Sequence, residues 1–513
     1  MAESSKRKML LINMFASVSV FIVHIGINFV LSPFIVKHMG VEANGFIMLA
    51  NNFVTYATLL TNALNSMSSR FITLEYHKGE IELTNKYYTS LFFGNVILSL
   101  ILLIPTIILI FKLEYFLDIP SHLVFDVKLA FTFIFLNFFL GTLLPSWGGC
   151  YYITNKLYIQ SIISIFSNFL RAILLIFLFS AFETKVYYVA LVASVLTIIS
   201  QILNFYFKRK LIPNIIITKG SFSWKCLKQL VSSGIWNSIS QLGTILLNGV
   251  DVLISNLFLG PVIMGIVSVV KIIPNTISSL SSSISNVFSP SLVISYALND
   301  KKQIVKELKL GMRITSTILT VILAGLIVFG REFFALWQPS LEADFLYKLS
   351  ILSCLSYMVS NSLQCLYSVF TVVNKVKVNS ILIIMSGIVS TLVVFILLRY
   401  TDLGAYAIVG VSSCINVIRH FIYTIPYSAR LLGLKWTTFY PDVFKSIGIV
   451  IFDSIVGFIG FKFISFKSFP TLIIVGFLYA ITCLFINSYL LLNKNERKLV
   501  LNKIFRNKEK KEI

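Results

Sequence analysis

Long apolar stretches recur from one end of this chain to the other, and they constrain the fold more than any other feature of the sequence. Many of them run for about 18 residues or more, which is enough to cross about 30 Å of hydrocarbon as a helix. Composition agrees, because 57% of the 513 residues are hydrophobic and 12% are charged, whereas about a quarter of the residues in a soluble domain are charged. We therefore expect an all-α integral membrane protein.

The apolar stretches predict about fourteen transmembrane helices, although a count of twelve also fits the pattern. The expected spans are 9–36, 45–70, 88–111, 129–149, 158–182, 186–206, 231–259, 263–294, 310–330, 347–373, 378–399, 404–428, 443–463 and 471–492. Basic residues before the first span resemble the start of a signal peptide. The length of that span and the lack of a small-residue cleavage site predict a retained helix instead.

Short sequence matches recur about 220 residues apart. Gly40 and Gly45 match Gly260 and Gly265, and Asn28 matches Asn248. The stretch ITNKLYIQSIISI, which starts at Ile153, matches VVNKVKVNSILII, which starts at Val372. Because these matches share nearly one offset, they indicate the duplication of a membrane unit.

Basic residues fix the expected orientation of the chain. There are 43 Lys and Arg against 21 Asp and Glu, a net charge of +22, and cytoplasmic loops of membrane proteins are enriched in Lys and Arg. A cytoplasmic N-terminus places the densest basic clusters inside. These are Lys208-Arg209-Lys210, the run from Lys301 to Lys309, and the tail from Lys494 to Lys511. We expect both termini in the cytoplasm and no nucleic-acid partner; pairing of the basic tail with anionic lipids is a second interpretation of its charge.

The duplication also predicts how the chain is organised. Its offset covers six helices, an even number, so both copies enter the membrane from the same side. We expect two parallel six-helix repeats followed by two C-terminal helices. The predicted boundaries are an N-terminal lobe at 1–206, a basic cytoplasmic linker at 207–230, a C-terminal lobe at 231–428, two further helices at 429–492, and a basic cytoplasmic tail at 493–513. The linker is long enough to lie along the inner membrane surface as an amphipathic helix.

The sequence contains no recognisable motif for catalysis or for a cofactor. A phosphate-binding P-loop is missing, which argues against ATP hydrolysis, and the predicted outer loops 112–128 and 331–346 are too short for a catalytic domain. The five His have no metal-ligand spacing, and the six Cys are interpreted as small apolar side chains. We therefore expect no cofactor, no metal site and no enzymatic activity.

Basic residues inside the predicted spans are the first candidates for function, because a charge in the membrane is costly. They are Arg70, Arg171, Lys271 and Arg419. Cations outnumber acids in the spans, so a cavity that these residues share would be positively charged. Such a cavity suits an anionic substrate that carries phosphate.

Two further residues are candidates for ion coupling. Asp251 is the only acidic residue deep in either lobe and is the first choice for coupling to H⁺ or Na⁺. His24, central in the first span, is a weaker choice for a proton carrier. Asp453, in the span 443–463, is the other acidic residue that is a candidate for function.

Most of these candidates also have a purely structural interpretation. Arg70 and Arg419 would reach the inner headgroups by snorkelling, His24 would be neutral and hydrogen-bonded between helices, and Asp251 and Lys271 would form an ion pair. Arg171 is hard to explain in this way, because it lies near the middle of its span. Polar residues along the spans would either bind sugars or pack helices; they include Asn51, Asn52, Asn62, Asn65 and Ser281 to Ser283.

The helix count, the duplication, the glycine pairs after the first and seventh spans, and the Asn-Lys turn before the fifth and eleventh spans resemble the multidrug/oligosaccharidyl-lipid/polysaccharide (MOP) exporter superfamily. Within it, the chain is most similar to the Wzx-type polysaccharide flippases, which include O-antigen and capsule-unit transporters. The resemblance covers nearly the whole chain. It implies translocation of an undecaprenyl-pyrophosphate-linked oligosaccharide across the bacterial cytoplasmic (inner) membrane by alternating access. It also implies a cationic lumen, for which the four basic candidates qualify by their place in the helix count.

The partners that this resemblance implies are the lipid-linked oligosaccharide, membrane lipids, H⁺ or Na⁺ as a counter-ion, and glycan polymerases. A lipid II flippase of the same superfamily is an alternative, since it too needs cations and two extra helices. A multidrug exporter would need an acidic cavity, and a membrane-embedded glycan polymerase or ligase would need a large polar outer loop. The scarcity of acids and the short loops argue against these two. The sugar unit, the coupling ion and the oligomeric state stay open.

Overall fold

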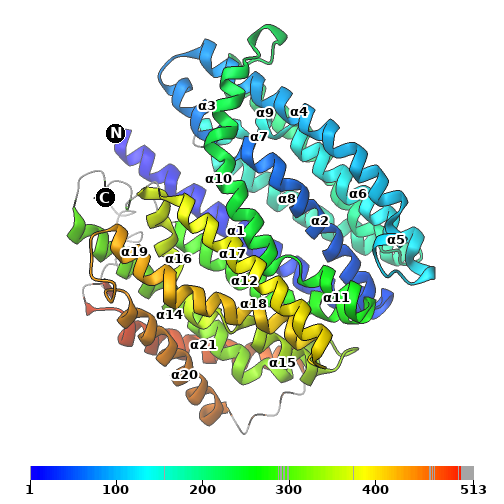
Figure 1. Ribbon diagram of the computed structural model, residues 1–513, viewed down its shortest axis with the longest axis vertical. Helices are drawn as coiled ribbons and strands as arrows, with labels where there is room; N and C mark the ends of the chain where they lie inside the picture. Colours follow the sequence, from blue (N-terminus) through cyan, green and yellow to red (C-terminus); the bar gives the residue numbers. More distant parts are fainter. Residues whose placement is uncertain are drawn as a thin grey trace, which may run out of the picture. The chain divides into compact units, whose positions relative to one another are not determined.

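A computed structural model describes residues 2–497 except 155, 287, 289–291, 293–294, 297–299, 374, 462–463, 465, 467 and 495; the side chains of a few more residues, His24 among them, also lie outside the described part. All regular secondary structure in these residues is helical (Figure 1). Twelve helical segments of the described chain are long and apolar enough to cross a membrane. Together with α1 (Ala2–Met39) and α2 (Val41–Asn65), they account for all fourteen predicted spans. The predicted all-α membrane fold is therefore confirmed.

By its internal packing the chain divides into two units, and the first comprises Met1–Val269 with Ile383–Gly387. Besides α1 and α2, its helices are α3 (Ser68–His77), α4 (Ile81–Phe111), α5 (Leu113–Phe116), α6 (Val124–Leu143), α7 (Pro145–Ile153), α8 (Leu157–Ala181), α9 (Tyr187–Leu211), α10 (Trp224–Asn248), α11 (Asp251–Leu259) and the start of α12 (Pro261–Asn286). Of all helix pairs, α2 and α10 make the most extensive contact. Gly234 of α10 permits it, because a Cβ there would lie 2.1 Å from the carbonyl oxygen of Ala63.

The second unit comprises Val270–Leu382 and Ile388–Ile513. Its helices are the rest of α12, α14 (Lys301–Trp337), α15 (Ala343–Cys354), α16 (Tyr357–Val372), most of α17 (Val376–Tyr400), α18 (Ala405–Arg419), the π-helical turn η3 (His420–Thr424), α19 (Ile425–Leu431), α20 (Tyr440–Phe461) and α21 (Phe469–Leu491). Helix α14 lies at its centre and packs against α15, α16, α20 and α21. The lobe boundaries that the duplication predicts, at 206 and 231, stay a prediction.

The duplicated turns have the same backbone conformation in both copies. Gly40 and Gly260 each separate two helices and have φ values of 87° and 85°, in the left-handed region that favours glycine. The second duplicated turn repeats as well, because the backbone N–H of Lys156 donates to Tyr151 O and that of Lys375 donates to Phe370 O, both at 2.8 Å. Helices α8 and α17, which follow this turn, are both 25 residues long. Local geometry thus supports the duplication that the sequence indicates.

Four predicted spans are broken helices in the structure. The span 129–149 is interrupted before Pro145, 231–259 at Gly249, 347–373 at Leu355, and 45–70 between Asn65 and Ser68. Proline explains the first break, because it cannot donate to the preceding helix and clashes with it. Gly249 caps α10, and its carbonyl accepts a hydrogen bond from the Tyr56 hydroxyl at 2.7 Å. Discontinuous helices are common near the binding sites of secondary transporters.

The linker between α9 and α10 is not the amphipathic surface helix that the sequence suggested. Helix α9 continues to Leu211, a short 3₁₀ turn covers Lys219–Ser221, and α10 already begins at Trp224. Ile212 and Ile215 are fully buried against the core of the first unit. The Lys208 ammonium is buried too and donates to the carbonyl of Ile215. Two buried isoleucines and this internal hydrogen bond fix the linker against the first unit.

Candidate functional site

Arg419 is the candidate cation whose surroundings are defined best. It is the last residue of α18, in the second unit, and its Nη2 donates to Asn416 Oδ1 at 3.0 Å and to the Tyr367 hydroxyl at 3.2 Å. Its Nε and Nη1 are buried and have no hydrogen-bond partner among the described residues. No described carboxylate pairs with it. Arg419 therefore offers two oriented donors to an anion.

The π-helical turn η3 follows Arg419 directly and organises the site. Its first residue, His420, is 3% exposed, and His420 Nδ1 lies 3.4 Å from the Tyr367 hydroxyl and 3.3 Å from Thr424 Oγ1. The side chains of consecutive residues on a helix normally point about 100° apart. Here Arg419 and His420 are consecutive, yet both contact the hydroxyl of Tyr367. Single π turns inside α-helices are found frequently at functional sites.

An aromatic stack lies beside this arginine. The rings of Tyr423 and Tyr427 are stacked with centroids 4.9 Å apart, and Phe370 stacks on them at 6.2 Å and 5.9 Å. The Tyr423 hydroxyl is buried and has no partner among the described residues. Oriented polar donors beside aromatic faces are typical of small-ligand sites. Chemically, the cluster suits a ligand with both anionic oxygens and sugar rings. We refer to the following residues together as the Arg419 site: Tyr367, Phe370, Asn416, Arg419, His420, Tyr423 and Tyr427.

Arg171 lies in the first unit, near the middle of α8. It is half-buried, and its Nε has no hydrogen-bond partner in the described chain. Ser167 and Asn168, one turn earlier, share its face of the helix. Ser167 Oγ lies 3.1 Å from Ser200 Oγ of α9, so this face is polar and is turned toward α9. No described carboxylate pairs with Arg171, as a cationic site requires.

Arg70 and Lys271 differ in burial. Arg70 is exposed on the short helix α3, where it forms no ion pair with a described residue. Lys271 of α12 is 5% exposed. Lys271 is therefore a buried cation within the second unit, whereas Arg70 lies where snorkelling remains an adequate explanation. A role in substrate binding stays a prediction for both.

Asp251 is 3% exposed and is the first residue of α11. The N-terminus of a helix carries unpaired N–H groups and a partial positive charge, which stabilise a carboxylate there. The break at Gly249 thus explains how this acid is accommodated in the membrane. Its proposed role in ion coupling stays a prediction. The side chain of His24 lies outside the described residues.

Polar residues line matching faces of α2 and α10 in the first unit. On α2 they recur with helical spacing at Asn51, Thr55, Thr58, Asn62 and Ser66, and on α10 at Ser233, Asn237, Ser240, Thr244 and Asn248. Gln241 Nε2 of α10 donates to Thr58 Oγ1 at 2.8 Å, and Asn237 Nδ2 donates to Ser66 Oγ at 3.2 Å. Both helices also leave polar groups exposed, Asn51 and Thr55 on one and Thr244 and Asn248 on the other. The two helices therefore form one polar surface, and some of its amide and hydroxyl groups are exposed.

Other polar candidates pack helices instead. Asn65 and Asn95 exchange two hydrogen bonds between their amides, at 2.9 and 3.0 Å, and so join α2 to α4. Ser282 accepts a hydrogen bond from Gln364 at 3.1 Å, and Ser281 is buried. The contacts of Asn65, Ser281 and Ser282 agree with a role in helix packing. Asn51 differs, because it donates only within its own helix and is exposed.

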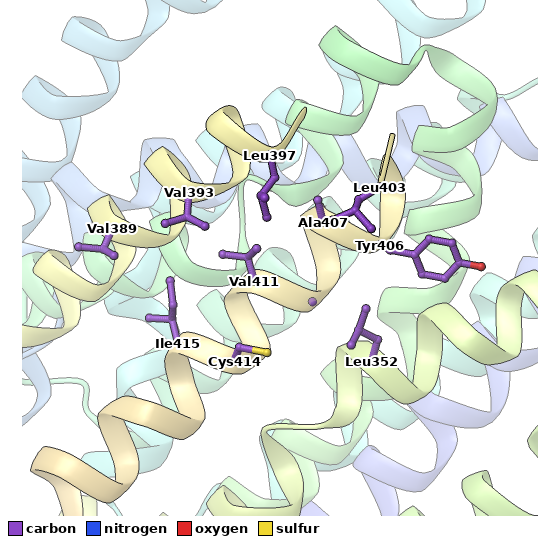
Figure 2. Close-up of a pocket in the computed structure, with 11 residues that line it drawn as sticks. Leu352, Val389, Val393, Leu397, Leu403, Tyr406, Ala407, Val411, Cys414 and Ile415 are labelled. Atoms are coloured by element: carbon purple, nitrogen blue, oxygen red, sulfur yellow. The ribbon is translucent and has the colours of Figure 1, made fainter. Parts of the chain in front are cut away.

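An apolar pocket with a volume of 380 Å³ lies between α15, α17 and α18 of the second unit (Figure 2). Its lining includes Leu352 of α15, Val393 and Leu397 of α17, and Ala407 and Val411 of α18. Figure 2 shows these side chains converging on one space, while the Tyr406 hydroxyl points away from it. No charged residue lines the pocket. It therefore does not suit a sugar or a pyrophosphate.

Solved structures show which class of protein has this fold. The lipid II flippase MurJ in an inward closed conformation matches with a TM-score of 0.64 and 17% identity, over 96% of this chain and 100% of that chain. A multidrug resistance MATE family transporter of the MOP superfamily, in an inward-facing conformation, matches with a TM-score of 0.62 and 14% identity, over 81% of this chain and 94% of that chain. At these identities the likeness establishes the fold alone, which this chain shares with both transporters.

The family follows from the sequence. A family model described as polysaccharide biosynthesis protein matches residues 10–294, and the chain belongs to this family. A curated relative, the uncharacterized membrane protein EpsK of Bacillus subtilis (strain 168), is 28% identical over 502 residues, which are 97% of this chain and 98% of EpsK. The comparisons therefore establish membership in this polysaccharide biosynthesis family, together with the fold that MurJ and the MATE transporter share.

Sequence reasoning missed most of the Arg419 site. It placed Arg419 and His420 in the same span, but it did not single out Tyr367, Tyr423 or Tyr427. Tyr423 and Tyr427 are four residues apart, a spacing that puts them on one helix face. That spacing is the one signal that could have pointed to the stack. Tyr367 lies 52 residues before Arg419, and nothing local connects the two.

Proposed function

We propose that this protein is a flippase that carries a lipid-linked oligosaccharide across a bacterial cytoplasmic membrane by alternating access, with both termini in the cytoplasm. It acts as a transporter and not as an enzyme. Family membership and the MOP fold support transport in polysaccharide biosynthesis. The observation that carries the substrate class is Arg419, an arginine inside a membrane-spanning segment with two buried donors free of any described acid.

The anionic part of the substrate binds at the basic residues. Nε and Nη1 of Arg419 donate to pyrophosphate oxygens in charge-assisted hydrogen bonds, which are about twice as strong as neutral ones. Arg171 and Lys271 add positive charge, and Arg70 attracts the headgroup at the cytoplasmic side. This charge offsets the cost of removing water from the phosphates.

The sugars bind through neutral groups. The faces of Tyr423 and Tyr427 stack on sugar rings, and the polar surface of α2 and α10 supplies amide and hydroxyl groups for hydrogen bonds. An oligosaccharide of the O-antigen or capsule type, carried on undecaprenyl pyrophosphate, fits these requirements. Glycan polymerases are the natural partners on the outer side.

Transport needs a driving force. An inside-negative membrane potential assists outward movement of a negative headgroup by about 2.3 kcal/mol per charge per 100 mV. Exchange for H⁺ or Na⁺ is the second source of energy, with Asp251 as the coupling carboxylate and His24 as a proton carrier.

Lipid II is the second candidate substrate, and the likeness to MurJ along the whole chain favours it. Both substrates carry a pyrophosphate on a lipid, so the cationic site does not separate them. A drug exporter is a weaker candidate, because the Arg419 site presents donors and no carboxylate to a ligand.

The test is a deletion strain complemented with variants. Deletion is expected to remove a surface glycan and to cause sugar-linked lipid to accumulate on the inner side of the membrane, with normal lipid II flipping and drug sensitivity. Loss of lipid II flipping would assign the second substrate, and altered drug sensitivity alone would refute both.

Arg419→Ala tests the site within that strain. We expect it to abolish glycan export while its membrane level, followed by immunoblot, stays normal, and we expect Arg419→Lys to restore only part of the export. Arg430→Ala is the matched control, because Arg430 is an exposed arginine on the neighbouring helix α19. Normal export by Arg419→Ala would remove Arg419 from the substrate site.

A further inference from the structure

Helices α20 and α21 bury a carboxyl group against α14. Asp453 of α20 is 0% exposed, and its Oδ2 accepts a hydrogen bond from Asn487 Nδ2 of α21 at 2.8 Å. No described basic side chain lies in ion-pair distance of Asp453. These two helices correspond to the last two predicted spans, 443–463 and 471–492, outside the duplicated repeats.

The hydrogen bonds around Asp453 leave two acceptors without donors. Asn487 Nδ2 gives its second hydrogen to Thr320 Oγ1 of α14 at 3.1 Å, and the Tyr479 hydroxyl donates to the backbone carbonyl of Asp453 at 3.1 Å. Asp453 Oδ1 and Asn487 Oδ1 are both buried and have no hydrogen-bond partner among the described residues. The Asp453 carboxyl group and the Asn487 amide thus make one hydrogen bond with each other. A protonated carboxyl group and an amide are able to make two.

A single bound proton would supply the hydrogen-bond donor that this pair lacks. An ionised carboxylate in an apolar bundle is strongly destabilising when, as among the described residues, no cation pairs with it. A proton on Asp453 Oδ1 removes the charge, turns that acceptor into a donor, and supplies a hydrogen for the amide oxygen. A sodium ion would need several oxygen ligands at once, whereas the proton needs a single acceptor.

The neighbouring titratable groups do not replace this proton. On α21 these groups are Tyr479, whose hydroxyl donates to the backbone carbonyl of Asp453, and Cys483, one turn further along the helix. Helix α21 contains no charged residue. On α14 and α20 the nearest charged residues, Arg313 and Lys445, lie two turns or more along the chain, and Arg313 pairs with Asp442. Helix α16, which also contacts α20, carries no charged residue.

We propose that Asp453, Asn487 and Thr320 form a binding site for a single proton, and that the bound proton holds α20 and α21 against α14. While the proton is bound, the acid–amide pair joins α20 to α21, and Thr320 ties the pair to α14. Loss of the proton leaves a buried negative charge, which favours separation of α20 and α21 from α14. The site is independent of the transported substrate.

Infrared difference spectroscopy of the purified full-length protein in lipid nanodiscs tests the proposal. The spectrum of the wild type minus that of Asp453→Asn, at neutral pH, is expected to contain the C=O stretch of a protonated carboxyl group that shifts to lower frequency in D₂O. Asp344→Asn is the matched control, because Asp344 is exposed and pairs with Arg331, so only carboxylate bands should change. Carboxylate bands alone in the Asp453→Asn difference would overturn the proposal.

Two further arms identify the ligand and guard against misfolding. The acid band should be the same in sodium-free buffer and in sodium chloride; a band that appears only without Na⁺ would assign the site to sodium and overturn the proton. The exchanged double variant Asp453→Asn with Asn487→Asp keeps one acid and one amide. It should regain the acid band and the thermal stability of the wild type, whereas Asn487→Asp alone should lose stability. Failure of the exchange to restore the band would also refute the site, and none of these readouts depends on glycan export.

Discussion

Gly45 of α2 and Gly265 of α12 are 220 positions apart in the sequence and lie against each other in the first unit. A Cβ on Gly45 would be 2.9 Å from the Cα of Gly265, and a Cβ on Gly265 would be 2.3 Å from the carbonyl oxygen of Val41. Asn44 Nδ2 donates to Ser268 Oγ at 2.7 Å beside this contact. Equivalent glycines of the two copies thus meet where the helices that follow the duplicated turns cross.

Substitution of either glycine should destabilise the protein. Gly265→Ala places a methyl group against backbone atoms, which cannot move as a flexible side chain does, and overpacking of this kind costs about 1–3 kcal/mol or more. Gly26→Ala on α1 is the control, since nothing lies within 4 Å of a Cβ there. Thermal unfolding in detergent measures the difference. An equal melting temperature for Gly265→Ala and the control would contradict the close contact.

A second prediction concerns the charged cluster at one end of α14 and α20. Arg313 Nε pairs with Asp442 at 2.9 Å and its Nη1 with Glu496 at 3.0 Å, and the three side chains are 16%, 5% and 13% exposed. Arg313→Met leaves two largely buried carboxylates without their arginine, so we expect a loss of about 3 kcal/mol. Arg331→Met breaks a pair that is 65% and 45% exposed and should cost less than about 1 kcal/mol. Chemical denaturation measures the free energy of unfolding of both variants. Equal losses for Arg313→Met and Arg331→Met would contradict the effect of burial.

The amide pair of Asn65 and Asn95 should contribute stability without binding substrate. Asn95→Ala leaves Asn65 Oδ1 without its donor, which costs about 1–3 kcal/mol in a buried setting. The double variant with Asn65→Ala should lose less than the sum of the single losses, because the two residues satisfy each other. Melting temperatures test this, with the exposed Asn51→Ala as the control that should not change. Additive losses would show that the two amides act separately.

The hydroxyl of Tyr423 should matter for transport and not for folding. It is buried without a partner in the described chain, so Tyr423→Phe should leave the melting temperature unchanged or raise it. Loss of one hydrogen bond to the substrate, about 1.4 kcal/mol, should reduce glycan export about tenfold. Tyr489→Phe, an exposed tyrosine of α21, is the control. Full export by Tyr423→Phe would place the hydroxyl outside the substrate path.

The helices and their duplication were predictable from the sequence because both depend on local pattern. A span such as 88–111 is mostly apolar and contains no charged residue, and α4 covers it as one helix. Gly40 and Gly260 signalled a turn, since glycine adopts a positive φ readily. The break at Leu355 was not predictable in this way, because the apolar pattern continues through it without glycine or proline.

The candidate site was harder to predict because its contacts are long-range. Arg419 stood out as a charge in a span, but its neighbours Tyr367 and Tyr423 are ordinary aromatic residues of a membrane helix. Asp453 stood out for the same reason. Its partner Asn487 lies 34 residues away on another helix, and only the fold brings the two together.

The meeting of Gly45 with Gly265 has a consequence for how this protein arose. A doubled gene implies that both positions descend from a single glycine in a shorter chain. Two copies of such a chain would touch through the same residue on each partner, which is the self-matching contact of a two-fold homodimer. Fusion of the two copies would make this contact intramolecular and leave each half free to diverge at its other positions.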